Sequence, residues 1–192
     1  MARWHGRSWA VVAVTLATVL AAACSSAPAG SGPAGRLARR QVTDRITVSS
    51  KAFGPGAPVP ARFTCDGDDR SPPLAWRGVP ASALELALVV DDPDAPGGTY
   101  VHWVVHGLDP GATGLAEAVL PPGARQARNS AGEARYKGPC PPGRSGAHHY
   151  RFTVYALDAR IAAGAGAGPG AVLDAIGEAA IAKGTLTGTY DR

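Results

Sequence analysis

The amino-acid sequence predicts a mainly β protein, either an antiparallel β-sandwich or a barrel, and three observations support this prediction. Short apolar runs, rich in Val, Ile, Thr and aromatic residues, recur from residue 46 onward. Clusters of Pro, Gly, Asp and Ser separate these runs and are typical of turns. Helical character is confined to one segment near the C-terminus. Short strands separated by regular turns are the pattern of an all-β domain.

Four strands are expected before the C-terminal segment. Residues 46–48 alternate between apolar and polar side chains, and residues 84–90 form a nearly continuous apolar run. Residues 100–105 combine aromatic and β-branched side chains, and residues 150–157 alternate again. The turn clusters between these strands lie at residues 53–56, 65–69, 71–73 and 121–123.

The C-terminal segment is expected to contain the one helix, followed by a last strand. Residues 162–170 are an Ala-Gly repeat of low complexity, which favours a loop. Residues 171–182 then predict a short helix, with Gly184 as its stop signal. Residues 184–190 alternate Thr with Gly, Leu and Tyr and are expected to form the final strand.

The N-terminus carries the features of a secretory signal. Arg3 and Arg7 precede an almost wholly apolar run at residues 10–23, which is short for a membrane span of about 20 residues. Small residues then precede Cys24, which is typical of a lipoprotein signal whose cysteine becomes the acylated first residue. The motif is imperfect, because Ala21 stands where Leu is usual. The alternative is ordinary secretion with an incidental cysteine.

We therefore divide the chain into a signal peptide at 1–23, a flexible tether at 24–43 and one domain at 44–192. The tether consists mainly of small residues, Pro and Arg, with almost no large apolar residue, and has too little apolar surface to offset its ordering entropy. The domain is long enough to bury a core. The formal net charge is +4, of which Arg3 and Arg7 leave with the signal, and no basic stripe remains. The expected location is extracytoplasmic and lipid-anchored to the bacterial cell membrane, and nucleic acid is not an expected partner.

Two cysteines remain if Cys24 is acylated. Cys65 and Cys140 both lie in Pro- and Gly-rich loops. An oxidising compartment favours a disulfide between them, but the sequence leaves two unpaired loop thiols equally open. Neither cysteine is expected to be catalytic, because no adjacent base or helix start would lower its pKa.

Polar residues at strand ends point to a site. The strand that ends near Asp92 and the strand that contains His102 are joined by a Pro- and Gly-rich connection, so both residues are expected at the same end of a hairpin. His148 opens a later strand. Side chains alternate between the two faces of a strand. In the strand that contains His102, one face would carry Tyr100, His102, Val104 and His106, and the other would carry Val101, Trp103 and Val105. In the strand that His148 opens, one face would carry His148, Tyr150, Phe152 and Val154. His102 and His148 are therefore expected to form the floor of a pocket with a loop rim, with Asp92 at the same end of the hairpin as His102.

Other polar residues have a structural interpretation. His106 and His149 are expected to be ordinary structural histidines whose ring nitrogens are satisfied. Asp94 lies in an Asp-Pro-Asp-Ala-Pro turn, and aspartates in turns accept hydrogen bonds from nearby backbone N–H groups.

These motifs resemble those of the phosphatidylethanolamine-binding protein (PEBP) family. The segments that carry the resemblance are residues 91–96, 102–105, 138–143 and 148–158, while residues 63–67, 71–76 and 184–190 are similar to the bacterial, Raf-kinase-inhibitor-like branch. The resemblance covers nearly all of residues 46–192. It implies a Greek-key type β-sandwich with a small pocket that accepts anions such as phosphate groups.

The resemblance also implies which residues bind the ligand. The family's pocket falls on Asp92, His102, His148 and Tyr150, with Pro139 and its neighbours on the wall. His149 stands where the family commonly has arginine. The expected ligand is a phosphate-containing small molecule or a lipid headgroup. No cofactor, no metal and no catalytic residue is expected, and we predict a non-catalytic binding protein.

In the expected binding mode, Asp92 orients and charges a histidine that donates to a phosphate oxygen. Tyr150 and backbone N–H groups of residues 138–143 would supply further donors. The main alternative is an inhibitor or regulator of another envelope protein, a kinase or hydrolase, acting through its loops. A metal-dependent hydrolase is less favoured, because the compact histidine spacing and a separate general base are missing. A Ser-His-Asp hydrolase is less favoured still, because no Gly-x-Ser-x-Gly elbow appears.

Overall fold

The computed structural model describes residues 42–192. The expected signal peptide, Cys24 and nearly all of the expected tether lie outside the described residues. Between residues 42 and 192, the structure contains no helix with the length and apolar character needed to cross a membrane.

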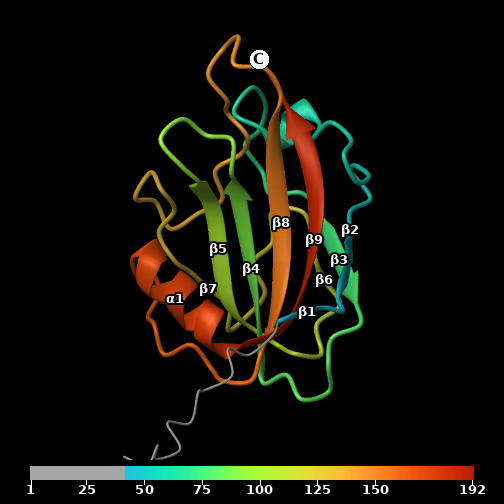
Figure 1. Cartoon of the computed structure of the whole chain (residues 1–192), viewed down its shortest axis with the longest axis vertical. Helices are drawn as coiled ribbons and strands as arrows, with labels where there is room; N and C mark the ends of the chain where they lie inside the picture. Colours follow the sequence, from blue (N-terminus) through green and yellow to red (C-terminus); the bar gives the residue numbers. More distant parts are fainter. Residues whose placement is uncertain (1–41) are drawn as a thin grey trace, which may run out of the picture. The chain divides into compact units, whose positions relative to one another are not determined.

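Two β-sheets form the body of this part of the chain (Figure 1). The larger sheet has six strands in the order β1 (Thr43–Asp44), β9 (Ala180–Tyr190), β8 (His148–Leu157), β4 (Glu85–Asp92), β5 (Tyr100–Leu108) and β7 (Arg125–Gln126). The smaller sheet has three strands in the order β2 (Thr47–Ser49), β3 (Leu74–Arg77) and β6 (Gly114–Leu115). Neighbouring strands pair antiparallel, except that β1 runs parallel to β9. A 3-10 helix, η1 (Ala61–Phe63), and one α-helix, α1 (Pro169–Ala179), complete the described elements.

The main core lies between the two sheets, as a β-sandwich requires. Val48, Trp76 and Leu115 of the smaller sheet belong to the same buried cluster as Leu88 and Phe152 of the larger sheet. Burial of such side chains contributes about 1.5–3 kcal/mol each. The prediction of a mainly β sandwich with one short helix before a last strand is confirmed.

A second buried cluster covers the other face of the larger sheet. There α1 packs its buried residues Val172 and Ile176 against Ala87 and Val104. Figure 1 shows α1 and the strands of the smaller sheet on opposite sides of the larger sheet. The larger sheet is therefore buried on both faces, which explains why residues 84–90 form an unbroken apolar run.

The helix begins and ends earlier than the sequence predicts. It begins at Pro169, within the expected loop, and ends at Ala179, and the strand β9 begins at the next residue. Ala180 and Ala182 are buried and alternate with half-buried neighbours, so packing against β8 overrides their helical propensity. Gly184 lies inside β9 and is not a helix stop. A Cβ atom at Gly184 would lie 1.9 Å from the carbonyl oxygen of Ile46, so the close approach of these two segments requires glycine.

Other boundaries differ by a few residues. Thr43, the last residue of the expected tether, already pairs with Ala182 in the larger sheet. The strands β3, β6 and β7 were not expected, because segments of two to four residues are too short to show a period.

A β-bulge changes the direction of His102. Val90 of β4 faces Trp103 of β5, whereas the next residue, Asp91, faces Val101. His102 is therefore an extra residue in β5, opposite no residue of its own. Because an inserted residue reverses the alternation beyond it, the expected shared face of His102 and the later β5 residues is wrong.

The packing clusters show the result. Val101 and Val104 both belong to the cluster beneath α1, whereas Trp103 and Val105 belong to the core between the sheets. In β8 the expected alternation is confirmed: Tyr150, Phe152 and Val154 all belong to the core between the sheets.

A second irregularity surrounds His106. Gly107 has φ of 73° and donates its backbone N–H to the Glu85 carboxylate at 2.8 Å. The His106 side chain is completely buried, and neither ring nitrogen has a hydrogen-bond partner among residues 42–192. The expectation that His106 is a satisfied structural histidine is therefore wrong. Burial lowers the pKa of His106, while the nearby Glu85 opposes this shift.

Candidate functional site

Three strand ends meet at one edge of the larger sheet. The strand β4 ends at Asp92, β5 begins at Tyr100 and β8 begins at His148. Since β8, β4 and β5 are consecutive antiparallel neighbours, these ends lie side by side. Figure 1 shows the loop between β4 and β5 and the loop that precedes β8 at this same end, near the C-terminus. Functional side chains on strand ends under loops are a common arrangement.

A cavity of about 280 Å³ lies at this edge. Its lining residues are Asp92, Ala95, Pro96, Tyr100, His102, Lys137, Cys140, Pro141, Pro142 and His148. The structure thus brings together the three residues on which the sequence argument rested, Asp92, His102 and His148. Pro139 and Tyr150 are buried and are not among the lining residues.

Asp92 holds both its own turn and His148. One carboxylate oxygen accepts the backbone N–H of Asp94 at 2.8 Å, and the other lies 2.8 Å from Nδ1 of His148. Both side chains are buried. An ionised carboxylate can only accept hydrogen bonds, so Nδ1 of His148 carries the hydrogen. In the neutral ring, Nε2 therefore has no hydrogen and carries a lone pair.

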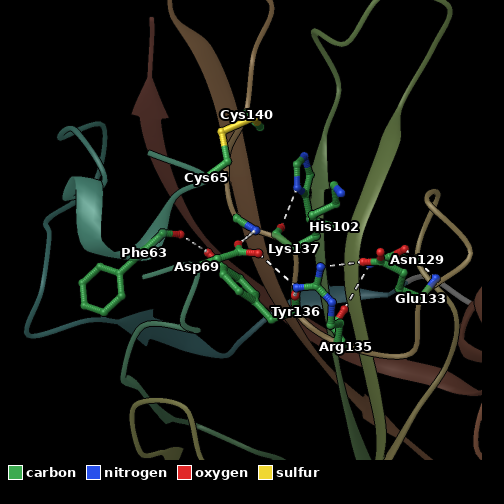
Figure 2. Close-up of polar contacts among 11 residues, drawn as sticks. Phe63, Cys65, Asp69, His102, Asn129, Glu133, Arg135, Tyr136, Lys137 and Cys140 are labelled. Carbon is green, nitrogen blue, oxygen red and sulfur yellow. Dashed lines mark hydrogen bonds and ion pairs between the residues drawn. A yellow bond between two sulfur atoms is a disulfide. The ribbon is translucent and has the colours of Figure 1, made fainter. Parts of the chain in front are cut away.

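His102 is held by a backbone carbonyl instead. Its Nδ1 lies 2.7 Å from the carbonyl oxygen of Lys137, and its own carbonyl accepts the backbone N–H of Lys137 at 3.2 Å (Figure 2). The carbonyl requires hydrogen on Nδ1, so Nε2 gains an N–H only when the ring is protonated. Burial lowers the pKa of His102, and the Lys137 carbonyl and Asp92 partly oppose that shift.

Tyr150 lies against His102. The two rings are 5.2 Å apart in an edge-on contact, and the Tyr100 ring lies against His102 in a tilted contact with a centroid distance of 4.8 Å. The Tyr150 hydroxyl is buried without a hydrogen-bond partner among the described residues. Burial, with a smaller contribution from Asp92, raises the pKa of Tyr150. Tyr150 thus supports the His102 ring and remains a neutral phenol.

The wall that carries Lys137 is anchored to a distant loop. Gly138 donates its N–H to Asp69 at 2.6 Å, and Arg135 pairs with the other Asp69 carboxylate oxygen at 3.0 Å. The Tyr136 hydroxyl donates to the carbonyl of Phe63 at 2.8 Å (Figure 2). Asp69 adopts φ of 53°, a left-handed conformation that Asp tolerates better than most residues.

A disulfide completes this anchor. Cys65 and Cys140 are joined, with Cα atoms 5.4 Å apart, so the choice left open by the sequence is resolved in favour of the bond. The backbone N–H of Cys65 also donates to the carbonyl of Pro139 at 3.1 Å. Figure 2 shows the bond beside His102. Pro139 therefore ties the two loops together next to the cavity.

The loop at residues 138–143 offers few backbone donors. Three of its six residues are prolines, which have no N–H. The N–H of Gly138 is taken by Asp69. Three residues have no N–H and that of Gly138 is engaged, so at most two backbone groups of this loop, those of Cys140 and Gly143, could act as the expected donors. Pro141 and Pro142 instead give the cavity an apolar wall.

Sequence reasoning missed three residues at the site. Tyr100 and Lys137 line the cavity, and the Ser145 hydroxyl oxygen lies 3.0 Å from Nε2 of His148. Lys137 stands directly before the Gly-Pro-Cys motif, so its position could have drawn attention to it. Ser145 lies in an irregular loop, and nothing in its sequence context marks it.

Asp94, His106 and His149, which the sequence analysis interpreted as structural, lie outside the cavity lining. The Asp94 carboxylate accepts the backbone N–H of His149 and pairs with its Nδ1, both at 2.8 Å. The backbone hydrogen bond, followed by the bond to the His149 ring, lowers the pKa of Asp94. Asp94 thus caps a backbone N–H, as its turn sequence indicates. Nowhere in residues 42–192 do three or more His, Cys, Asp or Glu side chains gather as potential metal ligands.

Comparison with known proteins agrees with this architecture. Residues 49–191 match the family model for phosphatidylethanolamine-binding protein. A Mycobacterium tuberculosis protein named "Putative lipoprotein LppC" is 47% identical over 146 residues, which is 76% of this chain and 72% of that protein.

Two crystal structures are also similar. CT736 of Chlamydia trachomatis, described as a PEBP homologue, has 37% identity and a TM-score of 0.71, with 78% of this chain and 99% of that chain covered. YbcL of E. coli, described as a new member of the mammalian PEBP family, has 31% identity and a TM-score of 0.74, with 77% and 99% covered. The chain therefore belongs to the phosphatidylethanolamine-binding protein family.

Proposed function

We propose that the cavity reversibly binds phosphate-type anions, either a small molecule or the headgroup of a lipid. The observation that supports this most directly is the charge of the lining: two histidines and Lys137 against one carboxylate, that of Asp92. Both Asp92 oxygens are already engaged, one with the Asp94 backbone and one with His148. Their hydrogen bonds reduce the repulsion that this carboxylate would exert on an anion.

Anion binding of this kind requires protonated histidine. In each ring the acceptor at Nδ1 fixes the hydrogen there, so neutral His102 and neutral His148 present lone pairs at Nε2. A fully deprotonated anion such as sulfate accepts hydrogen bonds and has no hydrogen to donate, so the imidazolium form is the one that binds it. Because burial lowers the pKa of His102, its full contribution is expected only at pH values below the ordinary histidine range. Affinity should therefore fall as pH rises.

The cavity walls suggest what surrounds the anionic group. Pro96, Pro141 and Pro142 line the cavity with rings that cannot donate hydrogen bonds. A pocket with few polar groups and otherwise apolar walls suits a ligand with an apolar part beside its charge. We expect an organic phosphate to bind more tightly than inorganic phosphate.

Titration calorimetry on the purified full chain tests the proposal. Sulfate is the primary probe, because its charge is constant between about pH 5 and 8, where histidine titrates, and phosphate and phosphoethanolamine follow. His102→Gln and His148→Ala should each weaken sulfate binding roughly tenfold to a hundredfold, the equivalent of about 1.5–3 kcal/mol for a charge-assisted hydrogen bond.

His149→Ala is the matched control, since His149 is exposed, pairs with Asp94 and does not line the cavity. It should leave the dissociation constant within about threefold, which corresponds to well under 1 kcal/mol. Sulfate affinity that is unchanged in His148→Ala, or that increases with pH, would contradict anion binding at this site.

We also propose that the chain is anchored outside the cytoplasm by acylation of Cys24. The M. tuberculosis relative with the lipoprotein name supports this, together with the signal-like N-terminus of the present chain. In a bacterial host the full chain should sediment with membranes, and Cys24→Ser should appear in the soluble fraction. Retention of the Cys24→Ser protein on membranes would show that another segment or a partner holds it there.

A further inference from the structure

Ser145, His148 and Asp92 lie in hydrogen-bonded series. The Ser145 hydroxyl oxygen is 3.0 Å from Nε2 of His148, and Nδ1 of the same ring is 2.8 Å from the Asp92 carboxylate. The three residues come from different parts of the chain: the end of β4, the loop before β8 and the first residue of β8. A nucleophile, a base within hydrogen-bond reach and a third group that orients the base are the parts of an activated serine site.

The tautomer of His148 is the one that a general base needs. Asp92 accepts a hydrogen bond from Nδ1–H, so the lone pair of neutral His148 is at Nε2 and faces the Ser145 hydroxyl. His148 and Asp92 are 4% and 3% exposed, so the ring is held in place and the carboxylate is shielded from water. Asp92 is fixed in turn by the backbone N–H of Asp94.

The backbone around Ser145 is tightly bent. Arg144 has φ of 67° and Gly146 has φ of 84°, so left-handed residues flank the serine on both sides. For a non-glycine residue such as Arg144 this conformation is unfavourable by roughly 1–2 kcal/mol, and such residues cluster at functional sites. The Ser145 backbone N–H donates to Pro142 at 3.1 Å and closes the turn. The turn holds an exposed serine with its hydroxyl against a buried histidine.

The hydroxyl has three competing acceptors. The Ser145 oxygen lies 2.8 Å from the carbonyl of Pro142, 3.0 Å from Nε2 of His148 and 3.4 Å from the carbonyl of Gly146. A hydroxyl carries one hydrogen, so it donates to one acceptor at a time. Because the oxygen is already within reach of the Pro142 carbonyl and of Nε2, rotation about the Cβ–Oγ bond switches the hydrogen from the first to the second without movement of the loop. The resting hydrogen bond to Pro142 predicts a slow reaction.

The cavity beside His148 supplies a place for a substrate. Pro141 and Pro142 join the serine turn to the cavity wall, and Lys137 lines the same cavity. A cation there stabilises the negative charge that develops on a carbonyl oxygen under attack. A cavity of about 280 Å³ admits a small ester and excludes a folded protein chain.

We propose that Ser145, His148 and Asp92 form an acyl-transfer site for small carboxylic esters. The Ser145 oxygen attacks the ester carbonyl carbon and its proton passes to Nε2 of His148. The bond from the carbonyl carbon to the alcohol oxygen then breaks, and His148 returns the proton to the departing alcohol. Water, deprotonated by His148, attacks the acyl-serine, which releases the carboxylic acid and restores Ser145. The net reaction consumes one ester and one water and yields one acid and one alcohol.

This inference departs from the expectation that the chain has no catalytic residue. That expectation came from a resemblance and from the missing Gly-x-Ser-x-Gly pattern, and neither could show which serine the fold places beside His148. The inference does not depend on anion binding, because the nucleophile and its base are defined by their own contacts.

A covalent probe tests the proposal directly. The full chain is treated with a fluorophosphonate, which transfers its phosphonyl group to an activated serine with loss of fluoride, and the labelled residue is located by peptide mass spectrometry. We expect one label per chain, on Ser145, and none in Ser145→Ala. His148→Gln should slow labelling by at least about a hundredfold, the usual contribution of a general base. With p-nitrophenyl acetate, a burst of nitrophenolate should match the protein concentration.

Two controls separate the outcomes. Ser82→Ala changes another exposed serine, in the turn before β4, and should label at the rate of the parent chain. Asp92→Asn gives a second variant in case His148→Gln does not fold, and it should slow labelling by a similar factor. No label on Ser145, or labelling that both His148→Gln and Asp92→Asn leave unchanged, would overturn the proposal.

Sulfate calorimetry on the same samples distinguishes the two functions. Ser145→Ala should lose the label, while the sulfate affinity of the parent chain measures the anion site separately. Sulfate binding without Ser145 labelling would refute acyl transfer and leave anion binding standing. Labelling of Ser145 without sulfate binding would refute anion binding and leave acyl transfer standing.

Discussion

The two histidines of the cavity are held by walls of different construction. On the His102 side, the loop at residues 136–140 is tied to residues 63–69 by a disulfide and by the Asp69 carboxylate. Two further hydrogen bonds join these segments, from the Cys65 N–H to the Pro139 carbonyl and from the Tyr136 hydroxyl to the Phe63 carbonyl. On the His148 side, residues 142–147 are exposed. The bonds that hold this second loop are the turn between Ser145 and Pro142, the Ser145–His148 contact and one bond from Arg144 to the carbonyl of Arg192.

The two histidines are therefore held in different ways. Contacts between segments far apart in the sequence fix the position of His102. Asp92 holds His148 at Nδ1, and the loop that covers His148 has mainly local contacts. Few buried contacts and exposed backbone mean a low free energy of local opening. We infer that the His102 wall is preformed and that the loop at 142–147 is the part that adapts to a ligand. Stability should therefore respond to changes in the first wall and not in the second.

Removal of the disulfide should produce the largest effect. The bond closes a segment of 75 residues, and loss of such a constraint is expected to lower the free energy of unfolding by about 2–5 kcal/mol. Urea denaturation of the Cys65→Ala, Cys140→Ala double variant measures this change. Gly143→Ala is the matched change in the other wall, where no atom lies within 4 Å of the added Cβ. It should change stability by less than about 1 kcal/mol, and a comparable loss in both variants would contradict the contrast between the walls.

Asp69→Ala should have the next largest effect. It leaves the Gly138 N–H without its acceptor and places alanine in a left-handed conformation. We expect a loss of about 1–3 kcal/mol in unfolding free energy and a severalfold weaker affinity for sulfate, because the Lys137 carbonyl that holds His102 is adjacent.

Asp69→Asn separates the contributions of Asp69. Asparagine can still accept from Gly138 and tolerates positive φ, and the ion pair that it removes is half exposed and contributes little. Its effect should therefore be less than half that of Asp69→Ala. Equal losses in the two variants would mean that charge, and not the backbone contact, is what Asp69 contributes.

Candidate-site residues that flank strongly patterned strands were predicted from the sequence. Those whose positions depend on the path of a loop were not. Asp92, His102 and His148 flank three well-patterned strands, so their convergence followed from strand order. The bulge at His102 did not follow, because register is set by packing against β4. Ala180 and Ala182 suit a helix or a strand, and burial against β8 decided between them. Lys137 and Ser145 lie in loops whose paths depend on the Asp69 anchor and on His148, contacts that no local pattern encodes.

His106 is a buried histidine outside the cavity, so it shows how burial alone changes stability. Of the replacements considered, that of His106 should change the free energy of unfolding least. Like His102 it is buried with a lowered pKa, but it lies outside the cavity lining and its ring nitrogens have no hydrogen-bond partner within residues 42–192. His106→Leu removes a buried polar group without a partner, so at about pH 7.5 we expect unchanged stability or a gain of up to about 1 kcal/mol.

The dependence on pH completes the test. In the unfolded chain both histidines titrate near 6.5, and in the folded chain their pKa values are lower. Below pH 6.5 the unfolded state therefore binds more protons, and the free energy of unfolding decreases as pH falls through this window. His106→Leu should reduce that decrease, because one of the two groups is gone, and His102→Gln should reduce it by removing the other. Denaturation midpoints at about pH 7.5 and 5 measure the slope. A slope that His106→Leu leaves unchanged would show that burial at His106 does not destabilise the charged ring, and the acid sensitivity would then belong to the cavity alone.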